Sequence, residues 1–284
     1  MLKTYIAQDV SPLDRTSLRE LWCHCMKNDF GPMGSTFEYL EQVTNTQSLE
    51  ALWDMHCRKM AEYGFDRLLY GFTRYRTPNS LGDPDDFIVL TNHAPEYTDV
   101  FMGQGLYFHA PMTRWAIEHD GASSWRHMAL ALSDIKLDEN AKKVIEFNRS
   151  MNVVAGYTVS FKSLSTRVKS AIALTGKPGL TQDDVDKIWA EHGQELIVMN
   201  NVVHLRIQSL PYSTAKRSLT KRQREALEWV GDGKTMQDIA LIMGLTPATI
   251  EKHLRFAREA LNVETTAQAV LKAALQTQMF VIDL

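Results

Sequence analysis

A chain of 284 residues is longer than most single domains, so its length favours two domains. Its composition, with 44% hydrophobic and 23% charged residues, is that of an ordinary globular protein. No run approaches the roughly 20 apolar residues that cross a bilayer, and the first residues lack the apolar core of a signal peptide. The three cysteines, Cys23, Cys25 and Cys57, favour a reducing, cytoplasmic setting over a disulfide scaffold.

The net charge of −3 does not by itself indicate a nucleic-acid partner. The charge is nevertheless uneven, because residues 213–284 carry 10 basic and 8 acidic side chains while the rest of the chain is acidic. This distribution permits a DNA-binding C-terminal end without proving one.

The first two thirds of the chain alternate between helical and β-prone patterns. Residues 1–34 form an N-terminal extension with a helix predicted at 13–26. Residues 35–210 form the first domain, with helices predicted at 35–63, 138–151 and 182–207 and strands at 66–75, 87–91, 157–161 and 170–175. The last two strands are predicted to be neighbours joined by residues 162–169. This order predicts an α+β domain, a central sheet covered by helices, which can enclose a pocket.

Residues 211–218, which contain Pro211 with several Ser and Thr residues, are predicted to form a linker. Residues 219–284 then predict an all-α domain of four helices, at 222–230, 236–243, 247–261 and 266–276. Thr235 has the chemistry of a helix N-cap, although no Glu or Gln follows at the spacing of a capping box. The spacing of Ala240 and Gly244 suits two helices that cross closely around a tight turn.

The third of these helices has two distinct faces. Its predicted buried face holds Ile250, Leu254, Ala257 and Leu261. The far face holds Ala248, Lys252, Arg255 and Glu259, with Glu251 on its flank. Such a helix can enter the major groove of DNA. There an Arg side chain can donate two hydrogen bonds to guanine, and a Glu side chain can accept a hydrogen bond from cytosine. The alternative is a surface helix whose charges are merely solvated. The fourth helix, rich in small and aliphatic residues, is either a dimer contact or core.

Six short segments of this domain resemble the DNA-binding domain of LuxR-type regulators. They are residues 219–227, 233–235, 239–240, 244–246, 249–254 and 261–263, and the match spans about 60 residues. One departure is Gln223, where the family usually has Glu, which puts a local hydrogen bond or ion pair in doubt. A second is Glu251, where many members have a basic residue, which suggests a different operator sequence.

The resemblance implies a homodimer that binds double-stranded DNA at a pseudo-palindromic operator. Lys234 and Thr235 are candidates for phosphate contacts. Glu251, Lys252 and Arg255 are the candidates for base reading. Thr249, at the start of the same helix, completes the predicted DNA-binding set.

The first domain resembles the autoinducer-binding domain of quorum-sensing regulators over roughly 130 residues. The residues that carry this resemblance are 92–101, His109-Ala-Pro111, Trp125 and Gly156. The family binds acyl-homoserine lactones with a Trp on the lactone carbonyl and an Asp on the amide N–H. Here Tyr97 stands at the Trp position and Ala110 at the Asp position. Phe101 replaces a usual Tyr, and His93 falls where some members have Tyr.

These departures predict a sensing pocket with an altered head-group chemistry. An amide N–H buried without an acceptor costs roughly 1–3 kcal/mol, and the side chain of Ala110 accepts no hydrogen bond. His109 compensates only if the local register shifts by one. We predict a pocket for a small apolar ligand formed by His93, Tyr97, Phe101, Ala110, Trp125 and Thr158. Three outcomes stay open: an unusual lactone binder, a receptor for another apolar molecule, or a ligand-independent regulator controlled by a protein partner.

Other chemistry has weaker support in the sequence. A metal site could be imagined from Cys23, His24 and Cys25 with His56 and Cys57. The first three residues are too close in sequence to chelate one ion together, and no second spaced pair exists, so no metal site is predicted. Residues 231–235, Gly-Asp-Gly-Lys-Thr, are similar to the end of a phosphate-binding loop. However, Glu228 occupies the position at which such a loop needs Gly. No persuasive nucleophile–base pair is found, so we predict no enzyme activity and no cofactor. An enzyme with an appended DNA-binding domain is the competing class.

Overall fold

The computed structural model describes residues 35–77, 80–126, 139–212 and 218–280. The chain divides into two compact units, Met1–Ile207 and Gln208–Leu284. The helix predicted at residues 13–26 and most of the predicted linker lie outside the described residues.

The N-terminal unit is built around a five-stranded antiparallel sheet in the order β2-β1-β5-β4-β3. Its strands are β1 (Phe65–Thr73), β2 (Ile88–Thr91), β3 (Gly121–Ser124), β4 (Gly156–Ser160) and β5 (Lys169–Gly176). The four predicted strands are confirmed, and β4 and β5 are neighbours as expected. Strand β3 was not predicted, because its sequence Gly-Ala-Ser-Ser lacks the β-branched and aromatic residues that favour strands.

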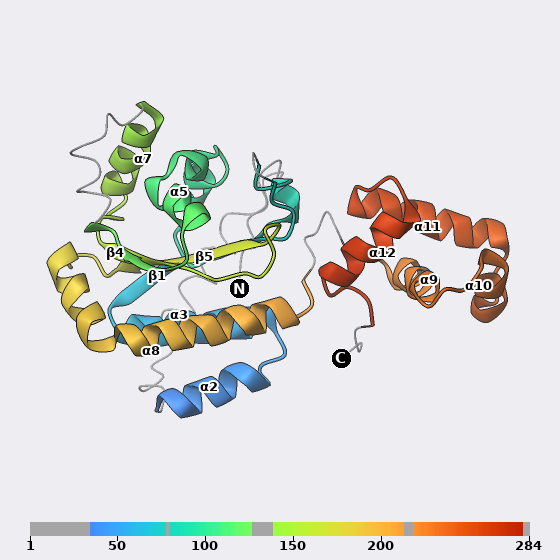
Figure 1. Ribbon diagram of the computed structural model, residues 1–284, viewed down its shortest axis with the longest axis horizontal. Helices are drawn as coiled ribbons and strands as arrows, with labels where there is room; N and C mark the ends of the chain where they lie inside the picture. The colour runs from blue at the N-terminus through green and yellow to red at the C-terminus, as the bar shows by residue number, and fades with distance from the viewer. Residues whose placement is uncertain (1–34, 78–79, 127–138, 213–217, 281–284) are drawn as a thin grey trace, which may run out of the picture. The chain divides into compact units, whose positions relative to one another are not determined.

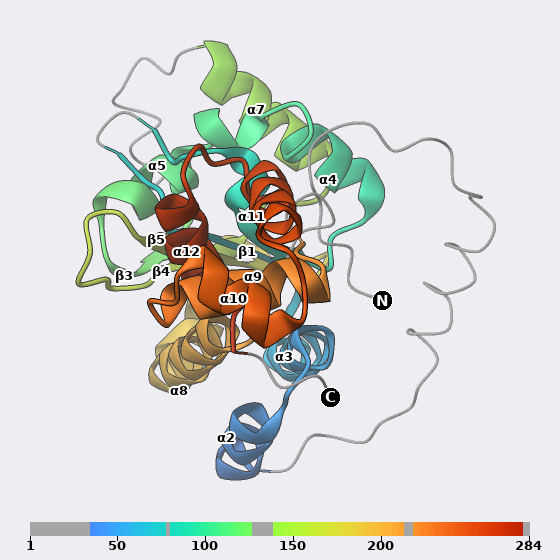
Figure 2. The same cartoon turned by 90° about the vertical axis from the view of Figure 1, so that its right-hand side faces the viewer.

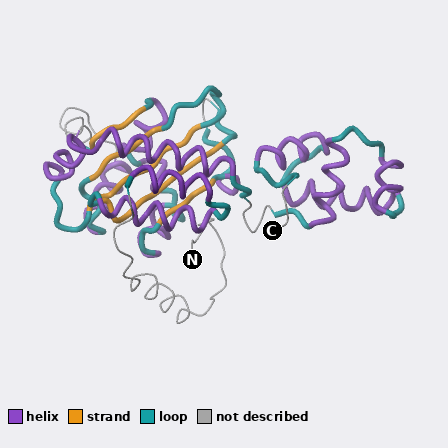
Figure 3. Tube along the Cα trace, turned by 90° about the horizontal axis from the view of Figure 1, so that it is seen from below, coloured by secondary structure: helices purple, strands orange, loops and turns teal. Residues whose placement is uncertain are grey.

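Helices cover both faces of this sheet (Figures 1 and 2). Helices α3 (Leu49–Glu62) and α8 (Gln182–Ser209) lie on one face, with α2 (Thr36–Asn45) beyond them. Helices α4 (Pro95–Phe101), α5 (Pro111–Glu118) and α7 (Glu139–Ser150) lie on the other face. Short 3-10 turns, η1 (Pro84–Asp86) and η2 (Leu106–His109), connect these elements. Seen from below in Figure 3, the helices of the first layer cross in front of the strands. The predicted α+β class is confirmed.

The helical stretch predicted over residues 35–63 is confirmed as helical, but it is interrupted. The chain forms two helices there, α2 and α3, with residues 46–48 between them. The hydroxyl of Ser48 accepts a hydrogen bond from the backbone N–H of Ala51 and so caps α3. A serine in this role satisfies one of the free N–H groups at a helix start. The signal for the break was therefore in the sequence.

The two faces of the sheet differ in the size of their side chains. On β1, Tyr70 and Phe72 point towards α8, where the ring of each lies about 6 Å from the imidazole of His204. Alternation along the strand places Leu69, Gly71 and Thr73 on the opposite face. There Gly71 is paired with Ala171 of β5, and Leu69 with Ala173. Small residues therefore line the sheet face that lies under α4, α5 and α7.

Buried hydrogen bonds fix α3 and α8 to each other and to the sheet. The imidazole of His56 lies 2.7 Å from the Tyr39 hydroxyl and 3.1 Å from the Asn200 side-chain oxygen. His204 makes an equivalent bridge between the Tyr70 hydroxyl and Ser170, at 2.8 and 3.3 Å. Because a buried polar group without a partner costs free energy, these bonds specify how α8 sits on the sheet.

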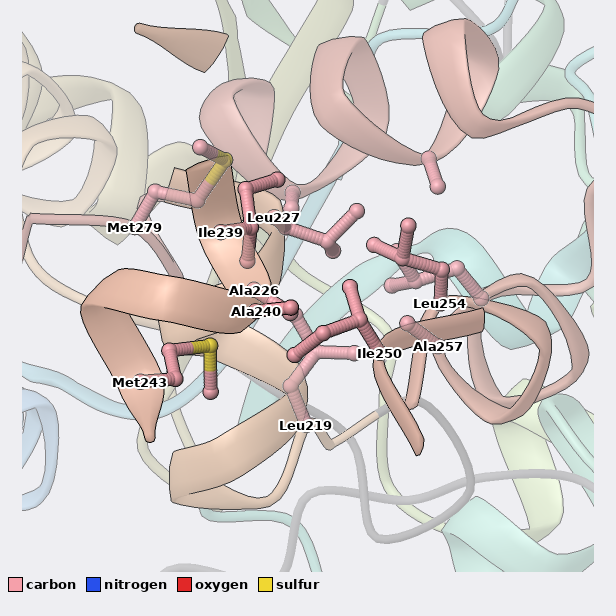
Figure 4. Close-up of a cluster of buried hydrophobic side chains, with 13 residues drawn as sticks. Leu219, Ala226, Leu227, Ile239, Ala240, Met243, Ile250, Leu254, Ala257 and Met279 are labelled. Carbon is pink, nitrogen blue, oxygen red and sulfur yellow. The ribbon is translucent and has the colours of Figure 1, made fainter. Parts of the chain in front are cut away.

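In its described residues, the C-terminal unit consists of four helices around an apolar core of its own (Figure 4). They are α9 (Lys221–Gly231), α10 (Met236–Met243), α11 (Pro247–Leu261) and α12 (Thr266–Leu275). The predicted buried face of α11 is confirmed, since Ile250, Leu254, Ala257 and Leu261 are at most 4% exposed. Gly244 ends α10 in the left-handed conformation, with φ of 66°, as the tight turn requires.

Capping boxes begin three of these helices. The expectation that Thr235 has no capping box is wrong, because Asp238 supplies the carboxylate that accepts from the Thr235 N–H at 3.0 Å. Gln223 completes a box with Thr220, accepting from its N–H at 2.8 Å. The replacement of Glu by Gln at this position therefore keeps that hydrogen bond.

Candidate functional site

A cavity of about 370 Å³ lies in the N-terminal unit between the sheet and helices α4, α5 and α7. This volume falls in the range of roughly 300–1,000 Å³ that is usual for small-molecule pockets. Its lining is mainly apolar and aromatic. It brings together all six residues predicted from the sequence, which are His93, Tyr97, Phe101, Ala110, Trp125 and Thr158.

Stacked aromatic rings form one wall of the cavity. Pro95 occupies the first turn of α4, where its fixed φ favours helix, and the helix then places Tyr97 and Phe101 one turn apart. The Tyr97 ring stacks on His93 at 4.3 Å and on Phe101 at 5.1 Å. The result is a flat, rigid apolar surface that costs little side-chain entropy when a ligand packs against it.

The indole of Trp125 forms a second wall, and its orientation is fixed twice. Its Nε1 donates a hydrogen bond of 2.9 Å to the Thr158 hydroxyl on β4. Behind the indole lies Gly156, where a Cβ atom would come within 2.9 Å of the ring and 2.3 Å of the Leu174 carbonyl oxygen. Only glycine leaves room for the indole at this place.

The residues flanking Trp125 are tied to the start of α8. The Ser124 hydroxyl and the Arg126 guanidinium both donate to Asp186, each at 2.7 Å, and Arg126 also pairs with Asp183. Burial alone would raise the pKa of Asp186, but hydrogen bonds from Ser124, Arg126 and Gln182 outweigh it and lower this pKa to about 2. This carboxylate is thus charged at neutral pH and holds the wall of the cavity against α8.

Two polar groups of the aromatic wall are strongly affected by burial. Burial, with a smaller contribution from the charge of Arg67, lowers the pKa of His93 to about 3, so its imidazole is neutral. Burial raises the pKa of Tyr97, which stays protonated and donates a hydrogen bond of 3.1 Å to Asn148 on α7. Both groups therefore offer hydrogen bonds without charge.

Ala110 lies at the start of α5, and its side chain faces the cavity. It is 5% exposed and occupies the N-cap position without any side-chain cap. The neighbouring His109 is exposed and does not line the cavity. The structure therefore does not bring His109 to the place of the family's carboxylate.

Sequence reasoning missed several parts of this cavity. Asn148 and Tyr107 line it, and so do the small residues Gly71, Ala171 and Ala173 on its floor. The sequence does contain a signal for the floor, since small residues alternate with large ones along residues 171–174. Asn148 left none, because it is 51 residues from its partner Tyr97.

The candidate DNA-binding residues lie mostly on the exposed face of α11 and at the start of α10. Glu251, Lys252 and Arg255 are exposed. Arg255 pairs with Glu259 at 2.6 Å, and Glu251 pairs with Arg258 at 3.0 Å. The guanidinium of Arg255 also lies 4.4 Å from the centre of the Phe256 ring. These contacts hold the charged side chains along one ridge of the helix.

The smaller candidates occupy helix starts. Thr235 is the N-cap of α10, and its hydroxyl donates to Asp238 at 2.6 Å. Lys234, just before it, is exposed. Thr249 is half-buried in the first turn of α11, with its hydroxyl 2.9 Å from that of Thr246, the N-cap of that helix. Thr246 was not among the predicted site residues.

The described part of the chain offers neither a metal site nor a membrane-spanning helix. It contains no group of three or more His, Cys, Asp or Glu residues placed to hold a metal ion. His56 is engaged by Tyr39 and Asn200 instead, and residues 23–25 lie outside the described residues. Within the same residues, no helix combines the length and the apolar composition that crossing a membrane demands.

An α+β domain with an apolar cavity, followed by a helix-turn-helix domain, defines the class of transcription regulators with a sensing domain. Residues 48–207 match the family described as "Autoinducer binding domain", and residues 217–273 match "Bacterial regulatory proteins, luxR family". The chain belongs to the LuxR family of regulators with an autoinducer-binding domain, which are not enzymes.

Two named transcriptional activators and one solved structure are among the proteins similar to this chain. "Transcriptional activator protein LuxR" from Aliivibrio fischeri is 35% identical over 235 residues, 82% of this chain and 88% of that protein. "Transcriptional activator protein YukR" from Yersinia ruckeri is 23% identical over 198 residues, 66% of this chain and 85% of that protein. The solved structure of SdiA from Escherichia coli is 17% identical, covers 87% of this chain and 98% of its own, and has a TM-score of 0.46.

Proposed function

We propose that this protein is a homodimeric transcription regulator whose DNA binding responds to a small apolar molecule held in the cavity of the N-terminal domain. The observation that carries the proposal is the cavity itself, with its stacked aromatic wall and its fixed indole. Residues 35–210 would form the sensing domain and residues 219–284 the DNA-binding domain. The family assignment supports a cytoplasmic protein that acts on double-stranded DNA.

In this scheme the protein has a DNA-competent state and a second state that does not bind DNA, and the ligand binds one of them more tightly than the other. It shifts the equilibrium only as far as it binds the DNA-competent state better, or worse, than the other state. One side of the cavity is formed by the helical layer of α4, α5 and α7, and the other side by the strands of the sheet beneath it. Filling the cavity therefore stabilises the sensing domain by burying apolar surface on both sides.

The sensing proposal is tested by native mass spectrometry of the purified full-length protein. We expect an apolar small molecule to copurify and to be lost on denaturation. A protein that is folded, empty and still fully active on DNA would contradict ligand sensing and would favour control by a protein partner.

The DNA-binding proposal assigns different roles to two basic residues. Arg255 must leave its pair with Glu259 to reach a base, and an exposed pair costs only about 0–1 kcal/mol to break. A bidentate contact with guanine is worth about 1–3 kcal/mol, so the exchange is favourable. Lys234 would instead contact phosphate, together with the start of α10. Thr249, Glu251 and Lys252 complete the proposed surface.

These roles are separated by measuring binding to many DNA sequences at several salt concentrations. Arg255→Ala should relax the preference at one base position, with a loss of about 1–3 kcal/mol on the preferred sequence. Lys234→Ala should weaken all sequences alike and reduce the salt slope by about 1. Identical behaviour of the two variants would contradict the assignment. Sedimentation of the protein on its operator, with two chains per site, tests the homodimer and the pseudo-palindrome.

A further inference from the structure

Hydrogen-bond acceptors are scarce on the cavity wall. Among the described residues that line it, none is Asp or Glu. The side-chain oxygen of Asn148, which can only accept, already accepts a hydrogen bond from the Tyr97 hydroxyl at 3.1 Å. A ligand group that must donate a hydrogen bond therefore meets no carboxylate along the described wall, and the wall's one side-chain amide oxygen is shared with Tyr97.

Donors, in contrast, remain available on the same wall. The Asn148 amide nitrogen carries two hydrogens, and its oxygen alone is used by Tyr97. The Thr158 hydroxyl accepts from Trp125, which leaves its own hydrogen to donate. Arg149, an exposed residue that also lines the cavity, has a guanidinium group that can only donate.

The other polar groups of the wall do not reverse this imbalance, since its remaining Thr and Ser hydroxyls donate as well as accept. Lys169 lines the cavity, but its ammonium group is held by the His119 carbonyl oxygen and by Asp120, at 3.0 and 2.9 Å. The neutral His93 imidazole and the Tyr107 hydroxyl each donate as well as accept, so a ligand oxygen satisfies them as well as an N–H does. Burial raises the pKa of Tyr107 to about 12, which keeps its hydrogen in place.

We propose that the cavity selects an amphiphile with an apolar chain and a head group of ester, lactone or ketone oxygens, with no amide N–H. This inference rests on the proposed sensing function and specifies its ligand class. Carbonyl oxygens meet the free donors of Asn148 and Thr158, while the chain packs along the aromatic wall. An amide N–H placed in the same position stays without a dedicated acceptor, which costs roughly 5- to 150-fold in affinity.

The test compares three probes with one acyl chain. They are N-octanoyl-homoserine lactone, the ester in which oxygen replaces the amide N–H, and the carbon analogue in which CH₂ replaces it. Binding to the full-length protein is followed by calorimetry. We expect the ester and the carbon analogue to bind at least as tightly as the amide, because neither brings an unpaired N–H. The carbon analogue also controls for hydrolysis of the ester.

Variants then add the missing acceptor. Asn148→Asp is nearly isosteric and replaces the amide nitrogen by a carboxylate oxygen, so it should shift the preference towards the amide probe by about ten-fold. Asn152→Asp makes the same chemical change at an exposed residue that does not line the cavity, and it should leave the preference unchanged. Ala110→Asp adds a carboxylate from α5 and should act in the same direction as Asn148→Asp.

Three results would overturn the inference. The first is a preference of the unmodified protein for the amide of about ten-fold or more, which would reveal an acceptor for the N–H and leave ligand sensing intact. The second is an unchanged preference in both Asn148→Asp and Ala110→Asp. The third is binding of none of the probes, in which case the copurification experiment, which uses no synthetic compound, decides separately on ligand sensing.

Discussion

At Gly156 the backbone of β4 passes so close to Trp125 that a single methyl group has no place. A Cβ atom there would meet the indole at 2.9 Å and the Leu174 carbonyl oxygen at 2.3 Å. At Gly71, on the cavity floor, a Cβ atom would meet nothing within 4 Å. The two glycines therefore have different structural roles. One positions a wall of the cavity, and the other keeps its floor empty.

We predict that Gly156→Ala destabilises the N-terminal domain by about 1–3 kcal/mol, because an overpacked site must move neighbouring atoms. It should also weaken ligand binding, since the displaced indole loses its bond to Thr158. Urea unfolding and ligand titration measure the two effects. Gly71→Ala is the matched control, expected to be neutral or more stable by up to about 1 kcal/mol. Equal effects of the two substitutions would contradict the packing argument.

At the scale of elements, the cavity floor is made by the pairing of β1 with β5. Gly71 lies opposite Ala171, and Leu69 opposite Ala173, so the space above the sheet is set by side-chain size across the pair. We predict that Ala173→Leu shortens the acyl chain that the cavity accepts. Each excluded methylene costs about 0.8 kcal/mol of burial, so long-chain ligands should lose far more affinity than short ones. A uniform loss at all chain lengths would show that the floor does not limit the chain.

The crossing of α10 and α11 depends on a small residue where the helices meet. Ala240 is 4% exposed and belongs to the core of the four helices, while its neighbour Leu241 is 82% exposed. We predict that Ala240→Leu destabilises the C-terminal domain by about 1–3 kcal/mol and weakens DNA binding, because α11 is pushed away from its partner. Leu241→Ala should stay within about 0.5 kcal/mol. Thermal unfolding and DNA titration of both variants give the comparison.

At the scale of the whole molecule, three buried histidines make stability depend on pH. Burial is the main cause that lowers the pKa from the ordinary value of 6.5 to about 4 for His56 and His204 and to about 3 for His93. The folded protein thus keeps these rings neutral, while the unfolded chain takes up protons below pH 6.5. Since the unfolded state then binds more protons, stability is lost as pH falls from about 6.5 towards 4.

We predict that the free energy of unfolding of the N-terminal domain falls by up to about 1.4 kcal/mol per histidine for each pH unit in this window. Urea unfolding at pH 7, 6 and 5, followed by tryptophan fluorescence, measures it. His56→Gln removes one of the three groups and should reduce the slope by about one third. A constant free energy of unfolding between pH 7 and 5 would contradict the prediction.

Local sequence determined most of the C-terminal unit. The limits of α10 and α11 follow from Thr235, Gly244 and Pro247, and the buried face of α11 follows from its spacing of apolar residues. The residues that determine these features lie within a few positions of them in the sequence, because helix caps, turns and helix faces depend on neighbours along the chain. The same holds for four of the five strands.

Only the tertiary structure decided the cavity. Tyr97, Phe101 and Trp125 were found from the sequence. The cavity floor, however, depends on the pairing of β1 with β5, about a hundred residues apart, and the free donors depend on the contact between Tyr97 and Asn148. Neither the register of distant strands nor the approach of α7 to α4 is encoded in any local pattern. Which hydrogen-bonding atoms remain free for a ligand is settled when these distant segments pack together, because each bond within the wall removes an atom from the set that a ligand can use.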